Sequence, residues 1–555
     1  MNDIYLSQLV DDASTDELVF RAYPSHGGYM RLQTVGVGRT AVGPRISYGA
    51  DTRFGRATVR PRTFFGGVLV ILIVGLVLRV WNLGAASLWT DEAMTAIRAQ
   101  ASFEESLASL LATGNQSPLY FWSLRLFPNT TETLLRLPSA LLGLAGVALM
   151  MALIVQLYQD RELALWIGAL LAVNPYHVWL SRTARPYSLM FVLAVLSTYF
   201  FLLLLRGHRS RAIWIGFTLT SIVAYSTHFT AVALPAAQYV LFAFVLRERH
   251  GMFRRWIASQ AIAAIPALVW AYIMLNQPLK VASEWIPDPE LRDIPLSLWN
   301  MILGYDGVFR WHMVPGLMIV TLGVVFGIGQ ALRERKTQWN NFYWVLLIVI
   351  PLVPVYIMSR FIVSIYVDRY FMVLLPALTV LLAVGLMRYS PQVWRGAMAV
   401  VILTGGYTVL FSFYDGSYQR TDWRSAAAYV AEGYRPGDAI VLERDNTEEV
   451  FSRYFRAEQQ VANRELQSHV MLMTNTPDPE TLEQSAVRLW VVYRNPNEDV
   501  HRMGLMPEFD PFDASLTPMG AWLSEHQDQV IEQRSYNGVR ILLIDTRQPM
   551  AVERP

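Results

Sequence analysis

The stretch FFGGVLVILIVGLVLRVWNLGAASLWTDEAMTAIRA (residues 64–99) joins an apolar run to two adjacent carboxylates, Asp91 and Glu92. A bilayer core is about 30 Å thick, so a helix needs roughly 20 mostly apolar residues to cross it. The run that begins at Phe64 has that length and composition. The stretch therefore predicts a membrane-crossing helix that is followed, at one face of the membrane, by a polar segment.

The composition of the chain agrees with a protein that crosses the membrane many times. Of 555 residues, 53% are hydrophobic and only 16% are charged, whereas an ordinary soluble protein has about 25% charged residues. A formal net charge of +2 gives no sign of a polyanionic partner, so we expect no nucleic-acid binding. The absence of cysteine excludes disulfides, thiolate nucleophiles and cysteine-bound metals.

Apolar runs of spanning length recur along the chain and predict about eleven transmembrane helices. The runs are residues 64–81, 136–158, 162–180, 186–205, 212–227, 231–247, 256–275, 314–332, 343–363, 366–388 and 393–413. We therefore expect an α-helical polytopic membrane protein, with its transmembrane domain at residues 63–413 and a flexible cytoplasmic tail at residues 1–62.

Clusters of basic residues predict the orientation of these helices. Arginines precede the first run and gather in RGHRSR (206–211), RERHGMFRR (247–255) and RERK (333–336). All these clusters fall on one side if the runs alternate, and basic loops favour the cytoplasmic side. We therefore expect a protein of the cytoplasmic membrane with its N-terminus inside and loop 82–135 on the outer face.

Beyond residue 413 the pattern changes from long apolar runs to short strands and helices. Residues 422–443 predict a helix, a Pro-Gly turn and a strand at 439–442, and the capping sequence NTEE (446–449) predicts another helix. Further strands are expected at 488–494 and 538–545. The alternation predicts an extracytoplasmic α/β domain at residues 414–555.

Taken alone, Asp91 and Glu92 are explained as acids in the first turn of a helix on the membrane surface. Thr90 has the residue type of an N-cap, and acids near a helix N-terminus each contribute about 0.3–1 kcal/mol through the helix dipole. SFEE (102–105) predicts a capping box that starts a second such helix.

Arginines at the predicted outer ends of helices indicate an anionic ligand, because the positive-inside rule should deplete them there. They are Arg182, Arg185, Arg360 and Arg369. Lipid headgroups, or acids such as Glu92 and Asp368, explain any single one. The close pair Arg182 and Arg185 favours a bound phosphate instead.

A set of motifs in one order carries a family resemblance. They are SLWTDEAMTAIRA (87–99), SPLYFW (117–122), RLPSAL (136–141), ARPYSLM (184–190), STHFTA (226–231), DRYFMVLLPAL (368–378) and DWRSAAAYVAEGYRPGDAIVL (422–442). The chain resembles a bacterial member of the superfamily that contains protein O-mannosyltransferases and the lipid A aminoarabinose transferase. This resemblance implies the GT-C fold, and an inverting transfer of a sugar from a polyprenyl-phosphate carrier at the outer face of the membrane.

The resemblance makes Asp91 the base for the acceptor or the group that positions it, with Glu92 beside it in the catalytic motif. Such a carboxylate accelerates attack by about 10²–10⁴-fold, and the departing phosphate needs cationic side chains. The residues expected to bind the donor phosphate are Arg182, Arg185, Tyr187, Arg360 and Arg369. Those expected to contact the acceptor or the sugar are His228, Asp368 and Tyr120.

The chain departs from the family pattern at two positions. Related sequences often have a histidine where Gln116 stands and an acid where Thr183 stands. No second acidic cluster accompanies Asp91 and Glu92, so we expect neither a metal nor another cofactor.

Two other classes of function stay open. A transporter or flippase for lipid-linked saccharides would carry functional ionisable groups at mid-membrane, whereas the charges here gather at the ends of the runs. A non-catalytic membrane assembly protein would keep the same architecture. The sequence leaves the sugar, the acceptor (protein, lipid or glycan) and the oligomeric state undetermined.

Overall fold

The computed structural model forms two compact units, Met1–Asp51 and Thr52–Pro555. The structure describes residues 20–24, 30–34, 59–113, 116–127, 131–276, 286, 288–304, 314–333, 339–387, 391–405, 410, 414, 421–443, 447–461, 471–473, 488–495, 509–513, 515 and 517–547. In the first unit, strands β1 (Phe20–Pro24) and β2 (Met30–Thr34) pair in antiparallel fashion. This hairpin was not predicted, and most of the expected flexible tail lies outside the described residues.

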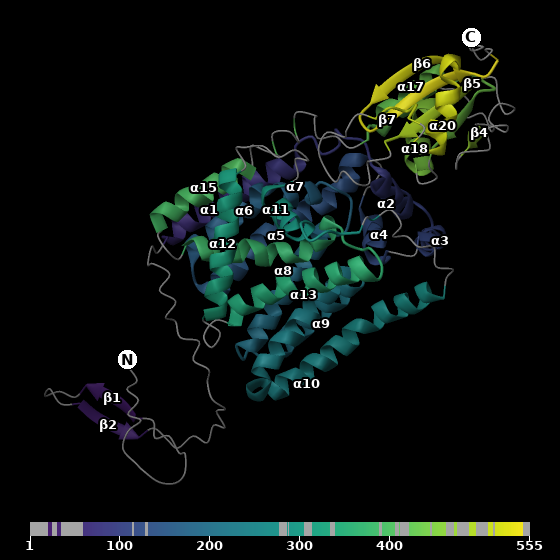
Figure 1. Cartoon of the computed structure of the whole chain (residues 1–555). Coiled ribbons are helices and arrows are strands. Elements are labelled where there is room, and N and C mark those ends of the chain that lie inside the picture. Colours follow the sequence, from purple (N-terminus) through teal and green to yellow (C-terminus); the bar gives the residue numbers. More distant parts are fainter. Residues whose placement is uncertain are drawn as a thin grey trace. The chain divides into compact units, whose positions relative to one another are not determined.

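The helices of the second unit follow the apolar runs of the sequence, except for one at residues 293–303 that lies between two runs and was not predicted (Figure 1). They are α1 (Pro61–Val80), α5 (Glu132–Tyr158), α6 (Arg161–Val173), α7 (Pro175–Ser181), α8 (Tyr187–Leu205), α9 (Arg211–Tyr225), α10 (Ala233–Leu275), α11 (Asp293–Leu303), α12 (Val314–Arg333), α13 (Trp339–Phe361), η4 (Asp368–Leu374), α14 (Leu375–Met387) and α15 (Pro391–Gly405).

Among the described residues, six helices are long and apolar enough to cross a membrane, or seven if the bent pair α6 and α7 counts as one span. Further apolar helices, such as α9 and Val314–Gly329, are shorter. A multi-pass membrane protein is therefore supported, and the number of about eleven crossings stays a prediction.

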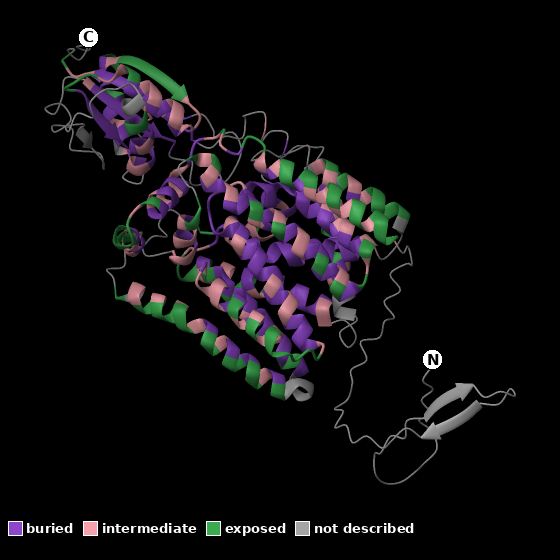
Figure 2. Ribbon diagram, turned by 180° about the vertical axis from the view of Figure 1, so that it is seen from behind, coloured by how far each residue is buried: buried purple, intermediate pink, exposed green. Residues whose placement is uncertain are grey.

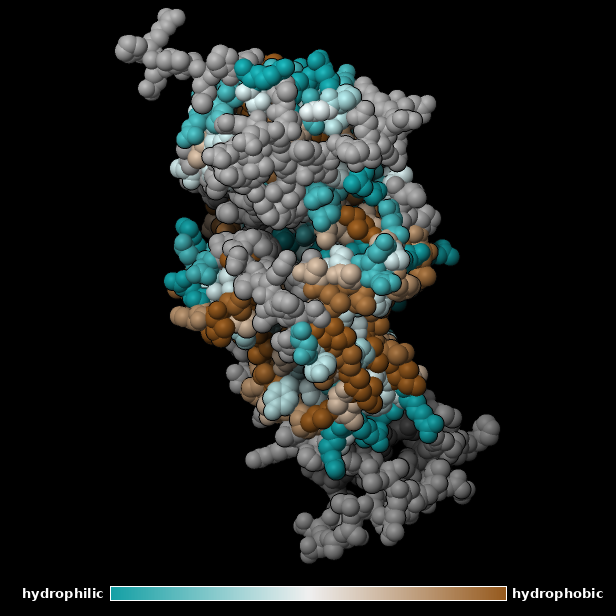
Figure 3. Space-filling view, turned by 90° about the vertical axis from the view of Figure 1, so that its right-hand side faces the viewer, coloured by the Kyte–Doolittle hydropathy of each residue, from teal (hydrophilic) through white to brown (hydrophobic). Residues whose placement is uncertain are grey.

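Burial orders the helices into an inner and an outer set. In the spanning windows of Tyr187–Leu205 and Asp368–Met387, 78% and 89% of the residues are buried, against 11% in Pro61–Val80 and Gly251–Met274. Figure 2 shows the buried residues concentrated in the middle of the helical body. Figure 3 shows hydrophobic residues covering much of one side of this body, with hydrophilic residues nearer its ends. An apolar exterior of this kind fits a lipid environment.

Helix α10 folds back on itself although it is one helical element of 43 residues. The Nε1 of Trp256 donates to the Oε1 of Gln238 at 2.9 Å, and the ring of Phe253 lies 5.2 Å from that of Phe242. A straight helix rises 1.5 Å per residue, so such partners would be well over 10 Å apart. The two halves of α10 therefore lie against each other, as two apolar runs separated by the basic RERHGMFRR segment require.

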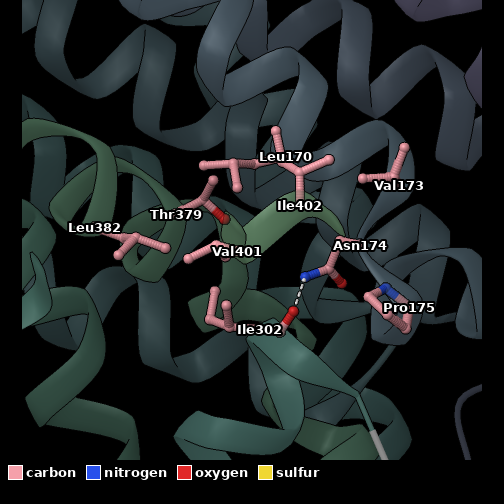
Figure 4. A pocket seen from close by; sticks show the side chains of 9 residues that line it. All are labelled: Leu170, Val173, Asn174, Pro175, Ile302, Thr379, Leu382, Val401 and Ile402. Atoms are coloured by element: carbon pink, nitrogen blue, oxygen red, sulfur yellow. Dashed lines mark hydrogen bonds between the residues drawn. The ribbon is translucent and has the colours of Figure 1, made fainter. Parts of the chain in front are cut away.

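The break between α6 and α7 comes from the dipeptide Asn174–Pro175. Proline has no N–H to continue α6, and the Oδ1 of Asn174 caps α7 by accepting from the N–H of His177 at 2.7 Å. The Nδ2 of Asn174 donates to the carbonyls of Met301 and Ile302 on α11. Figure 4 shows Asn174 at the edge of an apolar cavity of about 10 Å³, which is enough for one water and too small for a substrate.

Arg79, in the last turn of α1, is buried at the same break. Its guanidinium donates to the carbonyls of Leu171 and Ala172 at the end of α6 and contacts the Nδ1 of His177 at 2.7 Å. The unpaired carbonyls at a helix C-terminus are natural acceptors for a cation. This contact joins the end of the first predicted span to the bent helix pair.

Short helices follow α1: α2 (Thr90–Gln100), α3 (Phe103–Thr113) and α4 (Leu119–Ser123). The predicted capping box is confirmed, because Ser102 N–H donates to Glu105 and Glu105 N–H donates to the Oγ of Ser102. The prediction that Thr90 caps α2 is wrong. The helix begins at Thr90, and the preceding Trp89 provides no side-chain cap.

The C-terminal residues form a mixed five-stranded sheet in the order β4-β3-β5-β7-β6. Strand β3 is parallel to β4 and β5, and β7 is antiparallel to β5 and β6. The elements are α17 (Trp423–Gly433), β3 (Ala439–Leu442), α18 (Glu448–Val461), β4 (Met471–Met473), β5 (Arg488–Arg494), α20 (Pro518–Glu525), β6 (Val530–Tyr536) and β7 (Val539–Asp545). The predicted strands at 439–442, 488–494 and 538–545 are confirmed, whereas β4 and β6 were not predicted.

Both faces of this sheet are covered. Ile440 and Leu442 pack in one hydrophobic cluster with α17 and α18, and Ala439 and Val441 pack in another with α20, as the two-residue period of a strand requires. The first cluster also includes Leu88 from the segment before α2. The boundary at residue 414 and the extracytoplasmic location of this part stay predictions.

We expect Asn174→Ala to lower the free energy of unfolding by about 1–3 kcal/mol, because it removes a helix cap and leaves buried carbonyls without donors. Thermal unfolding of the detergent-solubilised protein measures this loss. The control is Asn276→Ala, since among the described residues the Asn276 side chain binds the exposed carbonyl of Tyr272. Equal midpoints for the two variants would contradict the role of Asn174.

Candidate active site

Asp91 lies in the first turn of α2 and faces two arginines from distant parts of the chain. Its Oδ2 is 3.7 Å from the Nη2 of Arg185, which precedes α8, and 4.0 Å from the Nη2 of Arg369 in η4. The Asp91 side chain is 30% exposed, while those of Arg185 and Arg369 are 7% and 14% exposed. The carboxylate is thus accessible, and the two cations are held in the protein beside it.

A third arginine, Arg98, adds positive charge next to this pair. Its Nη1 donates at 2.6 Å to the Oε1 of Gln116, and Arg185 approaches the same oxygen at 3.4 Å. Burial, and after it the nearby Arg185 charge, lowers the pKa of Arg98 to about 10. At neutral pH all three guanidinium groups still carry a charge, so the cluster is net cationic and favours an anion.

In the cluster, the hydroxyl of Tyr187 is buried beside the Arg369 guanidinium. The Nε of Arg185 is buried without a hydrogen-bond partner in the described part of the chain. Leaving such a group unsatisfied costs roughly 1–3 kcal/mol. Burial alone would lower the pKa of Arg185, but the Asp91 carboxylate and the neighbouring tyrosine hydroxyls raise it. The Arg185 guanidinium is therefore a permanent cation with donor capacity to spare.

Glu92 lies behind the cluster and has a different role from Asp91. Its carboxylate forms a two-pronged ion pair with the Nε and Nη2 of Arg136, at 2.9 and 2.6 Å. It also accepts from the backbone N–H of Ala184 at 2.8 Å. With only 1% of the residue exposed, Glu92 joins α2 to α5 and to the α7–α8 turn. This geometry makes Glu92 a positioning residue.

The structure separates the two arginines that the sequence grouped together. The Nη1 and Nη2 of Arg182 donate to carbonyls at the end of α1, including those of Trp81 at 2.6 Å and Asn82 at 3.0 Å. Burial lowers the pKa of Arg182, and a helix C-terminus compensates part of that cost. Arg182 thus holds α1, while Arg185 faces Asp91, so the expected phosphate clamp of Arg182 with Arg185 does not fit this geometry.

Asp368 and Arg360 are bound by partners other than Asp91. The Asp368 carboxylate is buried and accepts from Ser297 at 2.6 Å and from Asn300 at 2.8 Å on α11. These bonds anchor the residue that immediately precedes Arg369. The Nη1 of Arg360 lies 3.6 Å from Asp288, and both side chains are largely exposed.

The predicted acceptor residues His228 and Tyr120 have structural contacts. The Tyr120 hydroxyl lies 2.8 Å from the Oγ of Ser139, and both residues are buried. The His228 ring packs 6.1 Å from Tyr187 and 5.3 Å from Tyr370, at the edge of the cluster. Burial, with the charges of Arg185 and Arg369, lowers the pKa of His228 to about 3. His228 is therefore neutral at physiological pH and cannot act as a cationic acid there.

Sequence reasoning missed Arg98 and gave Gln116 no role. Arg98 is seven residues after Asp91, which places it on the same side of a helix two turns away. Thr95, one turn after Asp91, donates from its Oγ1 to the Asp91 carbonyl at 2.9 Å. The helical period of the first-loop motif was the signal that could have identified Arg98.

The described residues contain no group of three or more His, Cys, Asp or Glu side chains that could hold a metal ion. The carboxylates of Asp91 and Glu92 are paired with arginines instead, and that of Asp368 is bound by Ser297 and Asn300. The expectation of a metal-independent site stays a prediction.

No protein-family model matches this chain, and no curated protein sequence matches it. Among solved structures, the apo state of ArnT from Cupriavidus metallidurans aligns with a TM-score of 0.52 at 14% identity, over 88% of this chain and 99% of that chain. The likeness shows a shared fold. It supports the polytopic GT-C architecture that the motif order implied.

Two further structures are similar at lower scores. ArnT from Cupriavidus metallidurans bound to undecaprenyl phosphate aligns with a TM-score of 0.49 at 13% identity, over 88% of this chain and 98% of that chain. An oligosaccharyltransferase from Archaeoglobus fulgidus in complex with zinc and sulfate aligns with a TM-score of 0.48 at 10% identity, over 78% of this chain and 68% of that chain.

We expect Glu92→Gln to destabilise the protein far more than Asp91→Asn. Glu92→Gln leaves the buried Arg136 without its counter-charge, a loss of about 3–5 kcal/mol. Asp91 is partly exposed and its ion pairs are long, so its neutralisation should cost about 1 kcal/mol or less. Thermal midpoints of the two variants in the same detergent test this order. A midpoint for Glu92→Gln equal to that of the wild type would contradict the positioning role.

Proposed function

We propose that this protein is a membrane glycosyltransferase that moves a sugar from a polyprenyl-phosphate-linked donor to an acceptor. The observation that carries the proposal is the accessible Asp91 carboxylate beside the buried guanidinium groups of Arg185 and Arg369. The ordered motifs and the fold shared with apo ArnT support this class of reaction.

Asp91 acts on the acceptor in this proposal. Its carboxylate accepts a hydrogen bond from the attacking hydroxyl or amine and takes the proton as the new bond to the anomeric carbon forms. The bond from that carbon to the phosphate oxygen breaks, and its electron pair stays on the phosphate. A single displacement from the opposite side inverts the configuration of the sugar.

Arg185 and Arg369 act on the leaving group. The polyprenyl phosphate gains a negative charge as it departs, and preorganised guanidinium groups stabilise this charge without reorganising. The Nε of Arg185, which has no hydrogen-bond partner among the described residues, offers a further donor, and the Tyr187 hydroxyl lies nearby. Arginines therefore take the role that a metal would otherwise have, and no cofactor is part of the proposal.

Both Arg369 and Asp91 are held in place by neighbouring contacts, and such a fixed geometry favours catalysis. The Asp368 carboxylate is bound to Ser297 and Asn300, which holds the neighbouring Arg369 in place, and the Glu92–Arg136 pair holds Asp91. Orientation of reacting groups in this way contributes much of an enzyme's rate enhancement.

The proposal also places the reaction on one face of the membrane. We place Asp91 and the C-terminal sheet on the outer face of the cytoplasmic membrane, with the N-terminus inside, because the basic loops gather at the opposite helix ends. The exposed Leu126 and Phe127, which follow α4, offer apolar contacts for the lipid chain of the donor. The C-terminal residues contact the first loop through Tyr454, whose hydroxyl accepts from the N–H of Leu88 at 2.7 Å, and so border the acceptor side.

We expect Asp91→Asn to lower the rate of sugar transfer by about 10²–10⁴-fold, because the variant keeps the shape of the side chain and loses the base. The assay uses the purified protein with synthetic polyprenyl-phosphate sugars and measures the free polyprenyl phosphate released. An unchanged rate would eliminate Asp91 as the base. If the wild type moves the intact donor between leaflets of a vesicle and releases no phosphate, the protein is a flippase and the proposal is wrong.

Substitution of Arg185 or Arg369 should weaken the use of the donor. We expect Arg185→Gln and Arg369→Gln each to lower kcat/KM for the donor by about tenfold or more, since a charge-assisted hydrogen bond contributes roughly 1.5–3 kcal/mol. The matched control is Arg292→Gln, because Arg292 is exposed and its ion pair among the described residues is with the nearby, also exposed Glu290. Equal kcat/KM values in all three variants would contradict the proposal that Arg185 and Arg369 bind the donor phosphate.

A further inference from the structure

A second cationic site lies at the opposite end of the helical body from Asp91. A pocket of about 90 Å³ is lined by Leu204, Arg209, Trp214, Gly251, Met252 and Arg255. It forms where the chain leaves α8 and where α10 folds back. Helix α8 begins at Tyr187 in the Asp91 cluster and has 19 residues, so the two sites are about 28 Å apart along this helix.

The described residues that line the pocket offer donors and include no acid. Arg209 and Arg255 are exposed arginines that form no hydrogen bond or ion pair within the described residues. The Nε1 of Trp214 is buried and has no acceptor there. The remaining walls are the apolar Leu204 and Met252. A lining with two guanidinium groups and an indole N–H fits an anion with several oxygens, such as a phosphate.

The frame of the pocket is rigid. Gly207 has a φ of 93° and so allows the sharp turn that leads from α8 to Arg209, and the Oγ of Ser210 caps α9. The hydroxyls of Thr218 and Ser259 lie 2.8 Å apart and join α9 to the second half of α10. A site whose walls are fixed in this way binds with little ordering cost.

The surroundings identify the source of the phosphate. Directly beyond Trp214, Ile215 and Leu219 are 58% and 55% exposed on α9, and Ile257 and Ile262 are 46% and 53% exposed on α10. These side chains continue from the pocket along helices with apolar outer faces, where acyl chains can pack. Basic pockets between membrane helices are a known mode of binding anionic lipid headgroups.

We propose that this pocket binds the headgroup phosphate of an anionic phospholipid in the leaflet opposite Asp91. The lipid joins α8, α9 and the folded-back α10 and stabilises the folded protein by mass action, since the unfolded chain has no such pocket. Its effect is on stability and is independent of sugar transfer at Asp91.

The test compares phosphatidylglycerol with phosphatidylcholine in lipid nanodiscs and uses the intact protein. We expect phosphatidylglycerol to raise the thermal midpoint of the wild type by several degrees, and native mass spectrometry to show the lipid retained. In the double variant Arg209→Gln, Arg255→Gln, the affinity for phosphatidylglycerol should fall by about tenfold or more, with the midpoint in phosphatidylcholine unchanged.

The control is the double variant Arg211→Gln, Arg254→Gln, which removes the same charge from exposed arginines that do not line the pocket. An equal loss of phosphatidylglycerol binding in both double variants would show nonspecific attraction and overturn the site. Equal stabilisation of the wild type by inorganic phosphate in phosphatidylcholine nanodiscs would overturn the lipid as the occupant. No difference between the two lipids for the wild type would overturn the proposal entirely.

Discussion

The buried ion pair of Glu92 with Arg136 is the interaction on which the geometry of the candidate active site depends. Both side chains are nearly inaccessible, at 2% and 6% exposed, so each charge would be very costly without the other. Both side chains also form hydrogen bonds with backbone groups. Arg136 also donates to the carbonyls of Leu83, Ala86 and Ser87, and Glu92 accepts from Ala184. One pair therefore fixes the first loop, the start of α5 and the α7–α8 turn together.

This arrangement explains how two adjacent acids acquire different roles. Successive residues of a helix are about 100° apart, so a turn that buries Glu92 leaves Asp91 at the edge of the buried face. Asp91 then faces Arg185, which lies one residue after the Ala184 that Glu92 binds. Because the two acids share one helix turn, the buried pair sets the position of the accessible one.

The arginines at this end of the helices divide into two groups. Arg79, Arg136 and Arg182 bind carbonyls or a buried acid and hold helix ends together. Arg98, Arg185 and Arg369 gather around Asp91 and leave the cluster with excess positive charge. The first group is held by neutral carbonyls at helix ends and by the Glu92 carboxylate. The second group surrounds a single carboxylate, and our proposal gives its excess charge to the donor phosphate. The excess of arginine on the predicted outer face therefore has a structural and a chemical cause.

The sequence by itself predicted most of the apolar helices, the capping box at Ser102 and the buried strands near residues 441 and 491, and it selected Asp91 and Arg185 as candidate site residues. These features depend on local periodicity, on cap chemistry and on ordered motifs. Only the tertiary structure decided that Arg182 binds the end of α1 and that Arg98 joins the cluster. The reason is physical: an arginine side chain is long and flexible, so its partner is set by which carbonyls and carboxylates come within reach after packing.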